Sequence, residues 1–252
     1  MDQEYGEHYR DLFEKHWWWR ARTEYVIETL RRYRPQAGWN TILDIGCGDG
    51  LFFPRLKEFG QPEGVEPSRE LVSPDNPDRN RIHICPFDEQ FLPGKSYSLI
   101  LMLDVLEHIE RPVAALKHAL ELLEPGGTFL ATVPAFMVLW TNHDKLNHHF
   151  TRYTKTSFRE VAKGAGLKIQ EERYLYHWTF PVKLAQGFAE RVLRQEPKPP
   201  KASEGLVNEL LCRISRLEQR TLSRLPMPFG SSLMVVGKKS PARSLFDLRT
   251  SL

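Results

Sequence analysis

The chain has 252 residues, of which 41% are hydrophobic and 27% are charged, and a chain of this size and composition can bury one large core. Its formal net charge is only +3, and basic and acidic residues are interspersed, which argues against a nucleic-acid partner. The cysteines Cys47, Cys85 and Cys212 are widely spaced and form no Cys-x-x-Cys pair, which predicts a reduced compartment.

The first 38 residues are predicted to form a helical cap, with a helix over residues 3–34 that ends before Pro35 and Gly38. Three consecutive tryptophans, Trp17 to Trp19, lie within it. Neighbouring helical residues point about 100° apart, so at least one ring is expected to contact a ligand, a partner or an inserted segment. The alternative is that these rings only fix the helix to the domain.

The N-terminus shows no targeting pattern. Met1 is followed by Asp2, Gln3 and Glu4 instead of a basic and then an apolar region. No uncharged apolar run approaches the ~20 residues that a membrane-spanning helix needs. We therefore expect a soluble protein of the cytoplasm.

Residues 41–50 join a strand to a glycine turn. Residues 41–45 are an apolar, β-branched run, and three glycines follow at alternate positions, Gly46, Gly48 and Gly50. Glycines permit positive φ and let a ligand approach the main chain, while amides at the start of the next helix face the bound group. The pattern predicts a nucleotide-like ligand. Leu51 stands where the dinucleotide fingerprint has its third glycine, which disfavours NAD and FAD.

A carboxylate is expected about 20 residues after such a turn, at the end of the second strand. Glu66 ends the run Gly64-Val65-Glu66, and Pro67 stops the strand so that the side chain faces the crevice. A carboxylate can accept hydrogen bonds from both hydroxyls of a ribose. The glycine turn and Glu66 together predict a nucleoside site at this edge of the sheet.

Further strands alternate with helices, which predicts a doubly wound α/β sheet. Helices are expected over 51–59, 114–123 and 156–166, and strands over 82–85, 98–103, 128–133, 167–176 and 231–237. The run 98–103 is continuously apolar, as in a central parallel strand buried on both faces. We expect the backbone of Leu103 and Asp104 beside the ligand, because ligands bind at the carboxyl ends of such strands.

Residues 140–153 are the candidate catalytic segment, because proton-handling groups are unusually dense there: Trp140, His143, Asp144, His148, His149, Arg152 and Tyr153. A histidine with a pKa near ~6.5 suits proton removal from a hydroxyl or amine. His149 or His143 is the expected base, with Asp144 orienting it and Arg152 holding an anionic group. No metal is expected, and the alternatives are a metal site built from His143, Asp144, His148 and His149 or hydrogen-bonded scaffolding.

Residues 177–229 form an insertion before the last strand, where a hairpin would suffice, and an insertion of this size usually carries function. Its two helical parts are divided by the proline-rich run 197–201. The second part, over 204–225, has a broad apolar face of Val207, Leu210, Leu211, Ile214, Leu217, Leu222 and Leu225. A basic stripe of Arg213, Arg216, Arg220 and Arg224 lies beside that face. We expect this helix to pack on its own domain with a solvated basic flank; the alternative is contact with anionic lipid.

These motifs resemble the class I S-adenosylmethionine (SAM)-dependent methyltransferases, first through residues 42–50 and 64–66. Further stretches are similar to one subgroup, often labelled methyltransferase type 11 or 12: His16–Arg22, Leu103–Ile109, Val133–Phe136, Leu139–Trp140 and His143–Asp144. The similarity runs from about residue 16 to about residue 238. His149, Arg152 and Tyr153 match the subgroup's pattern of a histidine, two arginines and a tyrosine, but Thr151 replaces the first arginine.

The resemblance implies a Rossmann-like methyltransferase fold with seven strands, the last of them antiparallel. It assigns residues 1–38 to the cap, 39–240 to the methyltransferase domain with its insertion, and 241–252 to a tail.

The resemblance also implies that SAM is the cofactor. Asp44 would lie near the methionine ammonium, Asp88 near the adenine amino group with the Glu89 amide beside the ring, and Arg22 on the methionine carboxylate. Trp18 and Trp19 would cap this end, and His108 either touches the cofactor or holds its own turn. The expected cofactor set is Trp19, Arg22, Asp44, Gly46, Cys47, Gly48, Glu66, Pro67, Asp88, Glu89, Leu103, Asp104 and His108.

The implied reaction is methyl transfer to a small-molecule or lipid-linked acceptor, on oxygen in preference to nitrogen or carbon. The methyl carbon is already activated by the positive sulfur, so the enzyme mainly supplies alignment and acceptor deprotonation. The expected catalytic set is His149, His143, Asp144, Arg152 and Tyr153. Other hypotheses are a non-catalytic binding or adaptor protein with the same fold, and a nicotinamide oxidoreductase. Helix 204–225 is the candidate for peripheral membrane contact.

Overall fold

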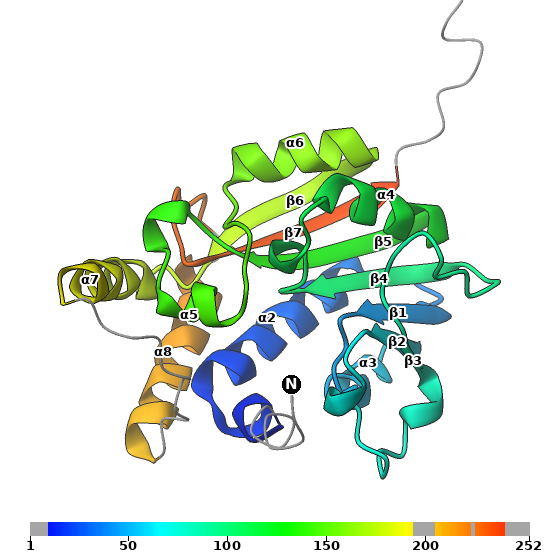
Figure 1. Cartoon of the computed structure of the whole chain (residues 1–252), viewed down its shortest axis with the longest axis horizontal. Helices are drawn as coiled ribbons and strands as arrows, with labels where there is room; N and C mark the ends of the chain where they lie inside the picture. The colour runs from blue at the N-terminus through cyan, green and yellow to red at the C-terminus, as the bar shows by residue number, and fades with distance from the viewer. Residues whose placement is uncertain (1–9, 194–204, 223–224, 240–252) are drawn as a thin grey trace, which may run out of the picture.

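The computed structural model describes residues 10–193, 205–222 and 225–239. A seven-stranded sheet with the order β3-β2-β1-β4-β5-β7-β6 runs through the molecule (Figure 1). The strands are β1 (Thr41–Ile45), β2 (Gln61–Glu66), β3 (Ile82–Ile84), β4 (Tyr97–Leu103), β5 (Leu123–Pro134), β6 (Leu167–Leu175) and β7 (Ser232–Lys239). The first five strands pair in parallel, and β7 is antiparallel to both β5 and β6. The expected doubly wound sheet with an antiparallel last strand is confirmed.

Helices cover both faces of the sheet (Figure 1). The α-helices are α2 (Trp17–Tyr33), α3 (Phe53–Leu56), α4 (Pro112–Leu122), α5 (Asn142–Leu146), α6 (Lys155–Ala165), α7 (Thr179–Val192) and α8 (Leu206–Thr221). Short 3-10 turns are η1 (Arg69–Leu71), η2 (Arg79–Arg81), η3 (Leu106–His108) and η4 (Met137–Leu139). Among the described residues, no helix has the length and apolarity that crossing a membrane requires.

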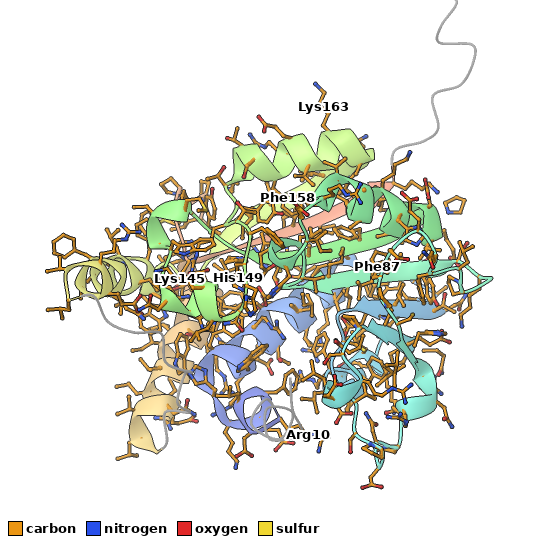
Figure 2. The ribbon with its side chains drawn as sticks, in the orientation of Figure 1. Arg10, Phe87, Lys145, His149, Phe158 and Lys163 are labelled. Atoms are coloured by element: carbon orange, nitrogen blue, oxygen red, sulfur yellow. The ribbon has the colours of Figure 1, made fainter. Side chains whose placement is uncertain are left out.

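Two hydrophobic clusters explain this layering. Side chains alternate along a strand, so Leu43 and Ile100 face a core that includes Leu116 of α4 and Phe158 of α6. Figure 2 shows Phe158 on the inner side of α6, towards the strands. On the opposite face, residues of β1 and β4 pack with α2 and α3 around Ile27. β4 is therefore buried from both sides, as its continuous apolar run predicts.

Two expected helices differ from the structure. The helix predicted over 3–34 is interrupted at His16, which has extended φ and ψ and caps α2 by accepting a hydrogen bond from the Trp18 amide. The crossover helix predicted over 51–59 shrinks to the four residues of α3. The chain must turn back at Gly60, where a Cβ would lie 2.0 Å from the Trp39 carbonyl oxygen.

The insertion contains the two expected helical parts, α7 and α8, whereas the dividing run 197–201 and the tail from 240 lie outside the described residues. The expected packing of α8 on its own domain is found, but through the opposite face. The buried residues of α8 are Asn208, Cys212, Ser215, Glu218 and Gln219. They lie against α2 because this helix offers polar partners, such as the Trp17 amide, that the sequence pattern of α8 alone does not reveal.

Candidate functional site

The carboxyl ends of the parallel strands meet at one edge of the sheet. Gly46 follows β1, Glu66 ends β2, Asp104 follows β4 and Phe136 follows β5. Ligands bind at this edge in doubly wound sheets. The structure therefore brings the main candidates from distant parts of the chain to one place.

The glycine turn has the backbone geometry that the sequence predicts. Gly46, Gly48 and Gly50 have φ of 73°, 54° and 64°, a region that residues with a Cβ rarely adopt. A Cβ at Gly46 would also lie 2.6 Å from a methyl group of Val105. The thiol of Cys47 is buried, and burial raises its pKa, so Cys47 contributes backbone and shape to the turn instead of a reactive thiolate.

Glu66 is held against the glycine turn. One carboxylate oxygen accepts from the Gly48 amide at 3.0 Å, and the other accepts from the Ser68 amide at 2.9 Å. Burial raises the pKa of Glu66, while these two hydrogen bonds lower it. Each carboxylate oxygen retains a further lone pair, so the fixed side chain can still accept from ribose hydroxyls. Pro67 is exposed beside it.

Glu66→Ala should weaken binding of S-adenosylhomocysteine by about 1.5–3 kcal/mol, because the ribose hydroxyls lose a charged acceptor. Calorimetric titration of the purified variant measures this loss, which corresponds to roughly 10–150-fold in Kd. Glu70→Ala, four residues further on and exposed, is the control and should bind like the wild type. Equal affinity of all three proteins would remove Glu66 from the site.

Asp44 is a buried carboxyl near the turn. Burial raises the pKa of Asp44 to about 7, against the opposing effect of the Arg22 charge, and the Glu66 charge raises it further. A cationic ligand such as an ammonium group would favour the ionised form. Asp44 is therefore suited to the predicted contact with the cofactor's methionine ammonium.

The raised pKa of Asp44 predicts how stability depends on pH. The pKa of Asp44 is about 3.9 in the unfolded chain and about 7 in the folded protein. Between these two pH values the folded protein binds more protons than the unfolded chain, so the free energy of unfolding falls as the pH rises. Urea unfolding between about pH 4 and pH 7 should show the wild type losing roughly 2–4 kcal/mol relative to Asp44→Asn. Asp88→Asn, at an exposed position, should instead follow the wild type. Parallel curves for wild type and Asp44→Asn would contradict the prediction.

The N-terminal cap reaches this edge through Arg22. Its guanidinium forms an ion pair with Asp104 and lies over the rings of Trp19 and Trp18, at 4.4 and 5.3 Å from their centroids. Arg22 and Asp104 are thus adjacent, and the predicted pairing of Arg22 with a cofactor carboxylate stays a prediction. The Trp17 ring lies 5.2 Å from that of Trp178, so one tryptophan does contact the inserted segment.

The remaining cofactor candidates are less enclosed. Asp88 and Glu89 are exposed after β3, and the Asp88 carboxylate accepts from the Gln90 amide at 2.8 Å. This bond fixes the local turn, and the predicted adenine contacts stay predictions. Leu103 is partly buried at the end of β4. His108 follows in η3 and is exposed.

Asp144 is the centre of the candidate catalytic segment. It is completely buried, and its carboxylate lies 2.9 Å from Nδ1 of His149 and 2.8 Å from both Nε and Nη2 of Arg152. Burial alone would raise the pKa of Asp144, but the hydrogen bonds from His149 and Arg152 hold it well below its usual range. With Nδ1 donating to Asp144, the other nitrogen of His149, Nε2, is left as the proton acceptor.

Two of the expected catalytic residues, Arg152 and Tyr153, have hydrogen-bond partners within the fold. Arg152 is buried, and its Nη1 donates to the Ala135 carbonyl at 3.3 Å, so its guanidinium orients Asp144 and ties it to the end of β5. Tyr153 is also buried, and its hydroxyl donates to the Leu106 carbonyl at 3.1 Å. These contacts give both side chains a structural role, and their predicted catalytic roles stay predictions.

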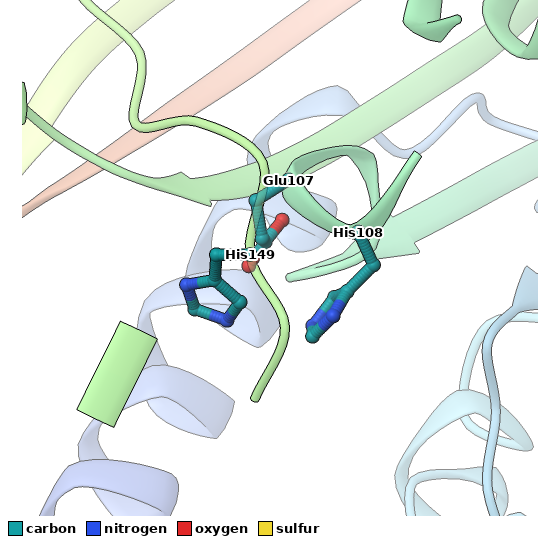
Figure 3. A group of neighbouring side chains, drawn as sticks. All are labelled: Glu107, His108 and His149. Atoms are coloured by element: carbon teal, nitrogen blue, oxygen red, sulfur yellow. The ribbon is translucent and has the colours of Figure 1, made fainter. Parts of the chain in front are cut away.

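Three residues have the spacing of a metal site, Glu107, His108 and His149 (Figure 3). Their ligand atoms lie within 4.8 Å of one another, and Figure 3 shows both rings beside the Glu107 carboxylate. Glu107 is buried, and its Oε2 has no hydrogen-bond partner among the described residues. Burial and the charge of Asp104 raise the pKa of Glu107 well above its usual range. Among the residues that the structure describes, the alternative set of His143, Asp144, His148 and His149 is not a group with this spacing.

Sequence reasoning missed Lys183, which lies on the face of α7 that contacts the catalytic segment. On the same face, Glu190 accepts from the Asn142 amide at 2.7 Å, and a Cβ on Gly187 would lie 3.2 Å from the Trp140 carbonyl. Burial and the Arg152 charge lower the pKa of Lys183 to about 8, although Asp144 and Asp104 oppose this. Within the described part of the chain, the Lys183 ammonium forms no hydrogen bond or ion pair. Only the three-dimensional position of α7 reveals this residue.

Positive φ at non-glycine residues was also missed. Asp104, Phe136, His148 and Tyr176 have φ between 53° and 58°. Three of them directly follow, or lie one residue beyond, the carboxyl ends of β4, β5 and β6. Such strained positions cluster at binding sites, and they mark the same edge of the sheet.

Comparison with known proteins agrees with this geometry. A family model described as a methyltransferase domain matches residues 18–172. Ubiquinone biosynthesis O-methyltransferase of Nitrosospira multiformis is 25% identical over 186 residues, which cover 62% of this chain and 77% of that protein. The enzyme of the same name from Bradyrhizobium diazoefficiens is 29% identical over 97 residues, 36% of this chain and only 38% of that protein.

A solved structure shows the same fold with the cofactor bound. Phosphoethanolamine N-methyltransferase 2 of Haemonchus contortus, in complex with SAM, aligns with a TM-score of 0.55 and 18% identity over 85% of this chain and 52% of that one. The sheet order, the glycine turn and Glu66 define a class I SAM-dependent methyltransferase fold. The chain belongs to the methyltransferase-domain family, and SAM is its cofactor. The resemblance stated from the sequence is thereby confirmed, except that the likeness of the segment around Trp17–Trp19 to one subgroup stays a prediction.

Proposed function

We propose that the protein transfers the methyl group of SAM to a hydroxyl oxygen of a small-molecule or lipid-linked acceptor, with His149 as general base. The observation that carries this proposal is the His149–Asp144 pair, with Nδ1 and the carboxylate 2.9 Å apart. Asp144 and His149 lie in the segment after β5, and β5 ends at the same edge of the sheet as the glycine turn, Glu66 and Asp44. In Figure 2, His149 lies to the left, where the parallel strands end, and Phe87 lies to the right of it.

The step is an in-line displacement. An acceptor oxygen attacks the methyl carbon, the bond between that carbon and sulfur breaks, and S-adenosylhomocysteine leaves. The acceptor proton passes to Nε2 of His149, and the Asp144 carboxylate stabilises the imidazolium that forms. His143, whose ring centroid is 6.2 Å from that of His149, is the second candidate for the base.

Lys183 supports an acceptor that carries negative charge. Its side chain is partly buried on the face of α7 that contacts the catalytic segment, and the charges of Arg152 and Asp144, which are paired with each other, shift its pKa in opposite directions. Burying a charge without a partner is unfavourable, so an acceptor oxyanion beside Lys183 would supply the missing partner. The names of the two bacterial relatives, ubiquinone biosynthesis O-methyltransferases, agree with oxygen as the atom that is methylated.

The test is product analysis with SAM that carries a trideuterated methyl group. The purified protein is incubated with paired acceptors that differ only in a hydroxyl or an amine on the same aromatic acid. Mass spectrometry should find the label on the hydroxyl compound. Label on the amine or on ring carbon would favour N- or C-methylation. Binding of S-adenosylhomocysteine without product from a broad panel would favour the adaptor hypothesis.

A further inference from the structure

The surface of α8 is divided into three sectors along its length. Around a helix of 100° per residue, the buried polar residues occupy one arc. The apolar residues Leu206, Val207, Leu210, Ile214 and Leu217 occupy a second arc, and they are all exposed. The arginines Arg213, Arg216 and Arg220 lie on the third, next to the apolar arc. The helix therefore turns its polar side to the protein and its apolar side outwards.

Hydrogen bonds keep α8 in this orientation. The Asn208 side chain accepts from the Trp17 amide at 2.7 Å and donates to the Lys15 carbonyl at 2.6 Å. Glu218 accepts from the Tyr25 hydroxyl at 3.1 Å and lies 3.0 Å from Nδ1 of His177. Rotating the helix to bury its leucines would leave these buried groups without partners. The outward apolar face is thus a stable feature of the fold.

α7 lies on the same side of the molecule as α8 (Figure 1) and also carries exposed apolar side chains. Phe188 is 69% exposed and Val192 is 61% exposed, values similar to the 57% and 62% of Leu210 and Leu217 on α8. The start of α7 is joined to α8 by a hydrogen bond from the Trp178 indole to the Ser215 hydroxyl at 3.3 Å. Large exposed apolar areas mark interaction surfaces.

We propose that the exposed faces of α7 and α8 dock onto an anionic lipid bilayer, with the apolar side chains in the acyl boundary and the arginines at the headgroups. Charge complementarity selects this occupant, because Arg213, Arg216 and Arg220 flank the apolar arc and an amphipathic helix of this kind lies in the membrane interface. The nearest acid, Glu209, pairs with Arg20 at 3.0 Å and with Arg213 at 3.7 Å. Arg216 and Arg220 form no ion pair among the described residues, so the charge of this stripe is only partly balanced within the protein.

This surface also narrows the acceptor class, an inference that rests on the proposed function. The opposite face of α7 carries Lys183, Gly187 and Glu190 against the catalytic segment, so one helix separates the docking surface from His149. An acceptor with a polar head and an apolar tail could keep its tail in the bilayer while its head reaches Lys183. The acceptor is thus a membrane-borne molecule with an acidic head group.

The test is vesicle flotation with the full-length protein. Vesicles of phosphatidylcholine alone are compared with vesicles that also contain phosphatidylglycerol, and the wild type should float only with the second kind. Each arginine near such a surface contributes about fivefold to binding. The variant Arg213→Gln/Arg216→Gln/Arg220→Gln should bind at least ~50-fold more weakly, and Leu210→Gln/Leu217→Gln should lose flotation.

The matched control removes the same number of charges elsewhere. Lys117→Gln/Lys163→Gln/Lys168→Gln changes three exposed lysines of α4, α6 and β6, and Figure 2 shows Lys163 pointing away from the sheet on the far side of α6. This variant should float like the wild type. Equal losses in the lysine and arginine variants, or no flotation of the wild type, would overturn the docking surface.

A second copy of the chain is the competing occupant. Light scattering that shows a dimer, converted to monomer by Leu210→Gln/Leu217→Gln, would overturn the proposal in favour of self-association. Methyl transfer to a soluble aromatic acceptor separates the two proposals. Methyl transfer without flotation would support the enzymatic function and overturn the membrane-docking surface. Flotation without methyl transfer would support the docking surface and overturn the proposed function.

Discussion

Asp144→Ala is expected to destabilise the fold by about 3–5 kcal/mol, because it removes the partner of a buried arginine. Arg152 is only 3% exposed and directs two of its nitrogens to Asp144 at 2.8 Å each. Without the carboxylate, the guanidinium would remain in the interior as an uncompensated charge. For a chain of this size the loss corresponds to a fall in Tm of roughly 6–20 °C, measured by scanning calorimetry.

The double variant Asp144→Ala/Arg152→Met provides the control. It removes both charges, so part of the stability lost in the single variant should return. It should not regain activity, because His149 loses the carboxylate that orients it. A double variant that is less stable than either single variant would show that the ion pair is not the main interaction.

His149→Ala is expected to lower kcat by about 10²–10⁴-fold, the usual contribution of a general base. The affinity for S-adenosylhomocysteine should stay unchanged, because no hydrogen bond links His149 to the glycine turn or Glu66 in the described chain. Single-turnover assays with trideuterated SAM measure the chemical step, and calorimetric titration measures the affinity.

His148→Asn is the matched control for this prediction. His148 is the preceding residue, is exposed and has φ of 53°, a conformation that asparagine tolerates well. It should retain turnover. Equal losses of cofactor affinity and turnover in His149→Ala would indicate scaffolding, whereas full activity would exclude His149 as the base and leave His143.

Local chemistry explains why much of the cofactor side could be predicted. Alternate glycines after a β-branched strand specify a turn with positive φ, and Glu66 follows at the distance set by one strand–helix–strand unit. Both signals depend on few residues that are close in the chain. The apolar run of β4 likewise indicated burial on both faces without knowledge of its neighbours.

The acceptor side was harder to predict because its pairings depend on the folded chain. The sequence shows Asp144, His149 and Arg152 as neighbours, but not that the buried Asp144 carboxylate contacts both of the other side chains. Lys183 lies 30 residues beyond the end of this segment and reaches it only through the packing of α7. Hydrophobic periodicity assigned the wrong inner face to α8, since the polar partners of Asn208 lie more than 190 residues away on the cap.

The left-handed backbone at Asp104, Phe136, His148 and Tyr176 limits how this protein can diverge. Each such conformation costs an L-residue about 1–2 kcal/mol. Selection would therefore remove a β-branched replacement at these positions even where the side chain takes no part in catalysis or binding. Accepted changes should drift towards asparagine, aspartate or glycine at these positions. The residue types accepted at this edge of the sheet are thus limited by backbone torsion angles as well as by the chemistry of the site.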